Sequence, residues 1–91
     1  MFLNQEKLEN VVETAFNSAS DNTRWQMAIV RARQQLQENP YIHDDGDALL
    51  ILSPSGEIYR ANGTCGCKAF ERGFPCWHRA AARIIERYHE A

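Results

Sequence analysis

Apolar residues recur three and four positions apart over residues 5–19, which predicts an amphipathic helix at the start of the chain. Asn4 precedes this stripe and is the predicted N-cap. Residues 17–22 are rich in Asn, Ser and Asp, whose side chains compete with the backbone for hydrogen bonds, so we expect the helix to end there. The apolar positions are Leu8, Val11, Val12, Ala15, Phe16 and Ala19.

A second apolar stripe predicts a second helix, which begins at Thr23 and runs to about Glu38. Thr23 and Gln26 have the spacing of a capping box, in which each side chain bonds a free backbone N–H group. Asn39-Pro40 is expected to end the helix, because proline cannot continue it and restricts the residue before it. The stripe consists of Trp25, Ala28, Ile29, Ala32 and Leu36.

A β-hairpin is predicted for the middle of the chain. Residues 48–52 are a short apolar run, residues 53–56 have the turn sequence SPSG, and residues 57–60 resume with alternating polarity. The acidic stretch HDDGD at residues 43–47 lacks the alternating carboxylates of a calcium loop. Residues 41–47 are therefore expected to form a solvated turn.

The last predicted element is a C-terminal helix, where apolar residues again recur at helical spacing. Its apolar positions are Trp77, Ala81, Ile84, Ile85 and Tyr88. The order α, α, β, β, α predicts an α+β fold in one compact domain. Residues 1–40 make its helical hairpin and residues 41–91 its ββα part.

Composition and charge narrow the class of protein. With 44% hydrophobic and 24% charged residues, the 91-residue chain has the composition of a folded globular protein. No apolar run approaches the roughly 18 residues that cross a bilayer, and the first residues lack the plan of a signal peptide. We therefore expect a cytoplasmic protein with reduced thiols and no membrane partner.

The net charge of −2 conceals an asymmetry between the two parts of the chain. Residues 1–58 carry four Lys/Arg and nine Asp/Glu, a net charge of −5, whereas residues 59–91 carry six and three, a net charge of +3. A basic C-terminal part permits contact with nucleic acid without demanding it.

All three cysteines and one histidine lie within residues 65–78, in the pattern C-x-C-x8-C-x-H. Three thiolates and one imidazole complete the tetrahedral shell of a structural zinc ion and leave no position for a reacting water. An odd number of clustered cysteines does not suit a disulfide framework. The predicted ligands of one structural Zn²⁺ are Cys65, Cys67, Cys76 and His78, and no catalytic residue is expected.

The ligand spacing predicts how zinc joins two elements. Cys65 and Cys67 are two positions apart and point to one side of an extended segment, with Gly66 allowing the backbone to turn. Cys76 and His78 cannot share a ligand from within one helix, since positions two apart are about 200° apart around its axis. We therefore expect Cys76 just before the helix, where N–H groups of the first turn donate to its thiolate.

The pattern resembles that of the SWIM-type zinc finger, which is C-x-C, a variable spacer, and C-x-H. The resemblance covers about residues 48–88 and implies a β-hairpin that leads into the first cysteine pair and a helix that carries the histidine. It implies the same four zinc ligands in this sequence. SWIM modules are regarded as DNA-binding or protein-interaction modules, so the resemblance implies one of these two roles.

Four alternatives remain open for the same residues. The cysteines could be free thiols in a small core, with His78 on the helix surface. His89 could replace His78 as a ligand, although it lies about 16 Å further along the same helix. A catalytic Cys–His pair would need a metal-free thiol and an orienting group, and a zinc enzyme would need an open coordination position.

Basic side chains surround the predicted zinc site. The predicted nucleic-acid contacts are Lys68, Arg72, Arg79, Arg83 and Arg87. A solvated helix face, partly neutralised by Glu86 and Glu90, is the alternative interpretation. Phe70 and Phe74 would stack on bases in the first interpretation and would cover a small zinc core in the second.

The leading hypothesis is a small, non-catalytic zinc-binding accessory protein that binds nucleic acid, with DNA as the expected form. The alternative is a protein-interaction adaptor whose surface is shaped by zinc and whose N-terminal hairpin docks a partner. In that case the apolar stripe of the first helix would be available for self-association or for another protein. This stripe contains Leu8, Val11, Val12 and Phe16.

Overall fold

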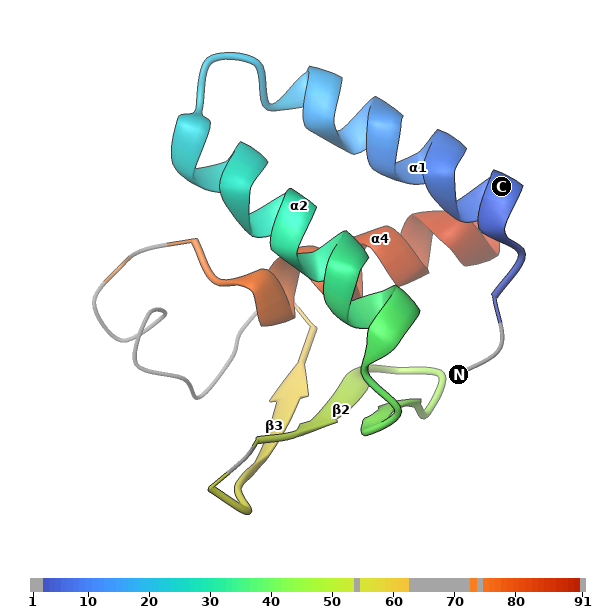
Figure 1. Cartoon of the computed structure of the whole chain (residues 1–91), viewed down its shortest axis with the longest axis vertical. Helices are drawn as coiled ribbons and strands as arrows, with labels where there is room; N and C mark the ends of the chain where they lie inside the picture. Colours follow the sequence, from blue (N-terminus) through green and yellow to red (C-terminus); the bar gives the residue numbers. More distant parts are fainter. Residues whose placement is uncertain (1–2, 54, 63–72, 74, 91) are drawn as a thin grey trace.

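The computed structural model describes residues 3–53, 55–62, 73 and 75–90. This part of the chain contains three helices and a three-stranded antiparallel sheet (Figure 1). The elements are α1 (Gln5–Ser18), α2 (Thr23–Glu38), β1 (Ile42–Asp44), β2 (Leu49–Leu52), β3 (Ile58–Ala61) and α4 (Trp77–Glu90). The predicted α+β class is confirmed.

Helices α1 and α2 form the hairpin that the apolar stripes predict, and α1 begins at its predicted N-cap. The Oδ1 atom of Asn4 accepts the backbone N–H of Lys7 at 3.0 Å. That N–H is one of the first-turn donors that have no partner within the helix. The helix ends at Ser18, inside the predicted polar stretch.

The start of α2 corrects one prediction, because Asn22 and not Thr23 is the N-cap. The Oδ1 atom of Asn22 accepts the N–H of Trp25 at 3.2 Å, so a side chain one residue earlier supplies the acceptor that Thr23 was expected to supply. Gln26 does not close a capping box. Its Nε2 donates instead to the carbonyl oxygen of Phe16 at 3.4 Å, which links the two helices.

The sheet contains a strand that the sequence did not predict. Strand β2 lies in the middle, with Ile42 of β1 opposite Ile51 on one side and Tyr59 of β3 opposite the same residue on the other. The prediction of a turn over all of residues 41–47 is therefore wrong for β1. An edge strand of three residues has too few positions to show alternation in the sequence.

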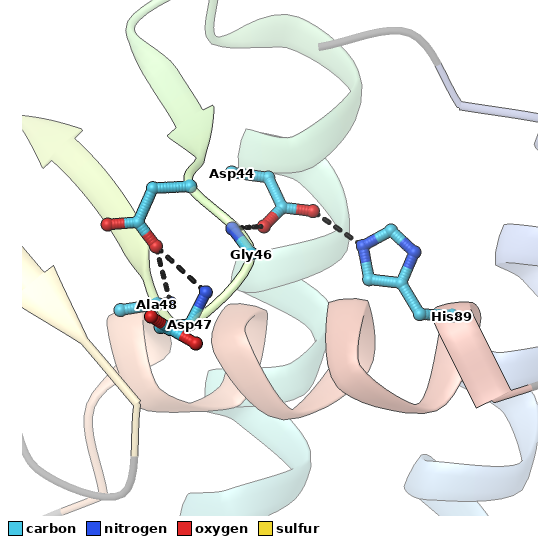
Figure 2. Close-up of polar contacts among 6 residues, drawn as sticks. Asp44, Gly46, Asp47, Ala48 and His89 are labelled. Atoms are coloured by element: carbon cyan, nitrogen blue, oxygen red, sulfur yellow. Dashed lines mark hydrogen bonds and ion pairs between the residues drawn. The ribbon is translucent and has the colours of Figure 1, made fainter.

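The rest of the acidic stretch is a turn, as predicted, and its own carboxylates hold it (Figure 2). Asp44 accepts the N–H of Gly46 at 2.9 Å, and Asp45 accepts the N–H groups of Asp47 and Ala48 at 2.9 and 2.8 Å. The φ angle of Gly46 is 94°, in a region that glycine adopts without the steric cost of a side chain.

One hydrophobic core joins the three helices to the sheet. Helix α4 crosses behind α1 and α2 in Figure 1 and also contacts β2 and β3. Phe16, Trp25 and Trp77 are partly buried and pack against this core. The buried side chains of the core are Leu8, Val11, Val12, Ala28, Ile29, Ala32, Leu36, Ile42, Leu49, Ile51, Ala61, Ala80, Ala81, Ile84 and Ile85. Among the described helices, none has the length and apolar character to cross a membrane.

Candidate functional site

Cys76 lies immediately before the first residue of α4, where its spacing from His78 predicts it. Its carbonyl oxygen accepts the N–H of Ala80 at 3.2 Å, which is the first hydrogen bond of the helix. Its Sγ atom accepts the N–H of Arg79 at 3.4 Å. The side chain is buried, with 4% of the residue exposed. Helix N–H groups favour a negative charge, so this position suits a thiolate that binds a metal.

His78 lies in the first turn of α4, half-buried against aromatic rings. Its ring centroid is 4.3 Å from that of Trp77 and 5.0 Å from that of Tyr59 on β3. Burial lowers the pKa of His78 from its ordinary value, and the charge of Arg31 on α2 lowers it further. The imidazole is therefore neutral over a wider pH range, and the neutral ring is the form that binds zinc.

These two residues fit a zinc ion, and the other two predicted ligands, Cys65 and Cys67, lie outside the described residues. Within the described part of the chain no group of three or more His, Cys, Asp or Glu side chains is placed to hold a metal. Tyr59 packs against His78, which places β3 beside the start of α4. Strand β3 ends at Ala61, so the end of the hairpin lies close to the start of α4, as the ligand spacing predicts.

The arginines of α4 do not form one uniform stripe. Arg79 is half-buried, with its guanidinium 5.4 Å from the ring centroid of Trp25 on α2. Arg83 is exposed and forms an ion pair with Glu86 at 3.1 Å. Arg87 is exposed and shares a cleft between α1 and α4 with Lys7. Lys68 and Arg72, together with Phe70 and Phe74, lie outside the described residues.

A groove of about 1070 Å³ lies between α2 and the start of α4, next to Cys76 and His78. We call it the α2 groove. Two apolar side chains of α2 in its lining are open to solvent, with Met27 68% and Val30 51% exposed. Its described lining residues are Phe16, Thr23, Arg24, Gln26, Met27, Ala28, Val30, Arg31, Gln34, Gln35, Pro75, Cys76, Trp77 and His78.

The interaction surface expected from the sequence was the apolar stripe of α1 and not this groove. Leu8, Val11 and Val12 are buried in the core, so these three side chains of the α1 stripe are not available to a partner in this fold. Met27 and Val30 are apolar residues three positions apart that the α2 stripe leaves out. That spacing was the signal for a second apolar face on α2.

Comparison with known proteins bears on the zinc motif alone. No curated protein and no solved structure matches the chain. A family model, described as SWIM zinc finger, matches residues 61–82, from the last residue of β3 into α4. This segment contains all four predicted zinc ligands. Residues 61–82 thus match the SWIM zinc finger, which confirms the resemblance and indicates a small zinc-binding module.

Proposed function

We propose that this chain is a non-catalytic protein-interaction module in which one structural zinc ion, held by Cys65, Cys67, Cys76 and His78, shapes the binding surface. The observation that supports this function is the α2 groove. It places the exposed side chains of Met27 and Val30 beside the helix start that carries two of the zinc ligands. Exposed apolar surface in a concave site is typical of protein or ligand contacts.

The proposed role of zinc is to hold one wall of this groove. The groove is lined on its other side by the residues that lead into α4 and begin it, Pro75, Cys76, Trp77 and His78. Metal ligation by Cys76 and His78 would fix the backbone of that wall, and four protein ligands would leave no open position for catalysis. The surface is then expected to exist only in the zinc-bound chain.

A pull-down from extract of the source cell tests this function. The tagged chain should retain a partner that is lost with the double substitution Met27→Ser/Val30→Ser and lost again when a chelator removes zinc. Ile58→Ser is the matched control, because Ile58 is 69% exposed but lies on β3 and does not line the groove. Retention of the same proteins by all variants would contradict the proposal.

Nucleic-acid binding is the second candidate function, and the exposure of Arg83 and Arg87 favours it. Lys7 adds a third cation beside Arg87. If these side chains contact phosphates, Arg83→Gln/Arg87→Gln should reduce the slope of log affinity against log salt by about 2. A filter-binding titration with duplex DNA at several salt concentrations measures this slope. Arg33→Gln is the control, since Arg33 pairs with Glu9 on the hairpin.

A further inference from the structure

The open face of α2 has the periodicity of a helix-docking surface. Thr23, Met27, Val30 and Gln34 follow one another at spacings of four, three and four residues, and all four line the α2 groove. Side chains at this spacing form one row along a helix, into which the ridges of a second helix fit. From Thr23 to Gln34 the row is about 16.5 Å long at 1.5 Å per residue, the length of about three helical turns.

Two arginines mark one side of this row. Arg24 and Arg31 are seven residues apart, so they lie on the same side of α2, about 10.5 Å apart along its axis. Both line the groove, and the described lining residues include no Asp or Glu. The charge of the described lining therefore favours an acidic occupant.

We propose that the α2 groove binds an acidic amphipathic helix of a partner protein, whose apolar face covers Met27 and Val30. Carboxylates one heptad apart on that helix pair with Arg24 and Arg31. This inference rests on the proposed protein-interaction function and assigns the class of its partner. A helix-in-groove interaction buries the apolar face of an amphipathic helix, here against Met27 and Val30, and the arginines beside them add charge complementarity.

Two other occupants fit the groove less well. A second copy of the chain that docked its own α2 would bring Arg24 and Arg31 towards the same residues of its neighbour, and like charges at an interface are unfavourable. A nucleic-acid backbone makes mainly ionic contacts and gains little from an aliphatic floor of Met27 and Val30. A helix gains from both the floor and the arginines, because burial of apolar area contributes about 25 cal/mol per Å².

A fluorescein-labelled synthetic peptide of about three heptads tests the inference by fluorescence anisotropy with the full chain in zinc-containing buffer. The peptide carries leucine at its a and d positions and glutamate at one flanking position of each heptad. We expect saturable binding that weakens as salt rises. The matched peptide, with glutamine for each glutamate, should bind more weakly and with little salt dependence.

Variants of the chain locate the binding. Met27→Ser/Val30→Ser should weaken binding about ten-fold or more, and Ile58→Ser should leave it unchanged. Arg24→Glu/Arg31→Glu should abolish the preference for the acidic peptide. The variant chain should instead prefer a peptide with lysine in place of each glutamate. Circular dichroism and zinc content show that each variant is folded and loaded, so that a loss of binding refers to the groove.

Each contrary result identifies a different error. If the unmodified chain does not bind the acidic peptide but retains a cellular partner that Met27→Ser/Val30→Ser releases, the acidic helix is wrong and the proposed function stands. If the unmodified chain binds neither the peptide nor a cellular partner, both proposals are wrong. A dimer that Met27→Ser/Val30→Ser dissolves in light scattering assigns the groove to a second copy. Duplex DNA that competes with the peptide assigns it to nucleic acid. If the peptide binds only to the variant Phe70→Ser, the groove is assigned to the chain's own residues 63–72.

Discussion

The two ends of α4 carry side chains of different chemistry. At its start are Cys76 and His78, two of the four side chains predicted to bind zinc. At its other end, His89 contacts the carboxylate of Asp44 on β1 at 2.5 Å (Figure 2), and the hydroxyl of Tyr88 accepts the N–H of Asn4 at 2.9 Å. The predicted zinc ion would hold the start of the helix, whereas contacts within the chain hold its end.

Between these ends, α4 is held by the hydrophobic core. Ala80, Ala81, Ile84 and Ile85 are buried, and they face α1, α2 and the sheet at the periodicity that the sequence shows. This middle part needs neither metal nor charge. Loss of zinc should therefore open the start of α4 and the α2 groove first. The core should hold the remainder of α4 in place until the whole domain unfolds.

Loss of zinc is expected to have the largest effect. Structural zinc contributes an apparent binding free energy of about 10–16 kcal/mol in zinc-finger peptides, comparable to the whole stability of a small domain. His78→Ala should therefore reduce bound zinc well below one ion per chain and lower the melting temperature strongly. Elemental analysis and calorimetry measure the two quantities.

His89→Ala is the control for this substitution, because His89 lies on the same helix and is not a predicted ligand. It should retain one zinc ion per chain. Zinc lost in His89→Ala and kept in His78→Ala would instead make His89 the fourth ligand. If both variants retain zinc, neither histidine is a required ligand, and the predicted role of zinc at the start of α4 is wrong.

The middle of α4 gives the next largest effect. Ile84 is 1% exposed, so Ile84→Ala deletes buried methyl groups and leaves a cavity, which should lower the free energy of unfolding by about 2–5 kcal/mol. Ile58→Ala makes the same chemical change at a residue that is 69% exposed and should cost about 0.5 kcal/mol or less. Urea unfolding of both variants in zinc-containing buffer measures the difference. Equal losses would mean that α4 is not held by this core.

The sequence predicts the elements whose apolar pattern extends over several turns. It does not predict a short strand, or a surface made by apolar residues that lie outside these patterns. The stripes of α1, α2 and α4 each extend over several turns and place the core correctly. Strand β1 has three residues and was expected to be part of a turn. The position of Cys76 followed from geometry, since two ligands two positions apart cannot both lie inside a helix.

The groove was missed because it depends on tertiary structure. Met27 and Val30 lie on the exposed face of α2, and single apolar residues on such a face are common in amphipathic helices. Only the approach of residues 75–78 makes them part of a concave surface. Similarly, Arg79, Arg83 and Arg87 recur every four residues, a spacing that places them on one face of a helix. The packing of Arg79 over Trp25 and the pairing of Arg83 with Glu86 depend on side-chain placement that spacing alone does not provide.

The smallest expected effect concerns the contact of Asp44 with His89 at the end of α4. The hydrogen bond from His89 lowers the pKa of Asp44 below its ordinary value of 3.8, and the N–H of Gly46 lowers it as well. A carboxyl group whose pKa is lower in the folded chain stabilises the fold above its unfolded pKa. This contribution should therefore be complete above about pH 5 and should be lost as the pH falls through 3.8 to the lowered value.

Asp44→Asn keeps the shape of the side chain and removes its charge, so it should cost about 0.2–1 kcal/mol near neutral pH, the range of a partly exposed pair. The cost should shrink towards zero below the lowered pKa, because Asp44 is then protonated in both states. Urea unfolding at several pH values measures it as the difference between the chain and the variant. Any zinc release at low pH affects both proteins alike and cancels in this difference, which isolates the end of α4 from the start that zinc is predicted to hold. Asp21→Asn, in the loop between α1 and α2, is the control, and an equal, pH-independent cost in both variants would mean that the contact with His89 contributes nothing.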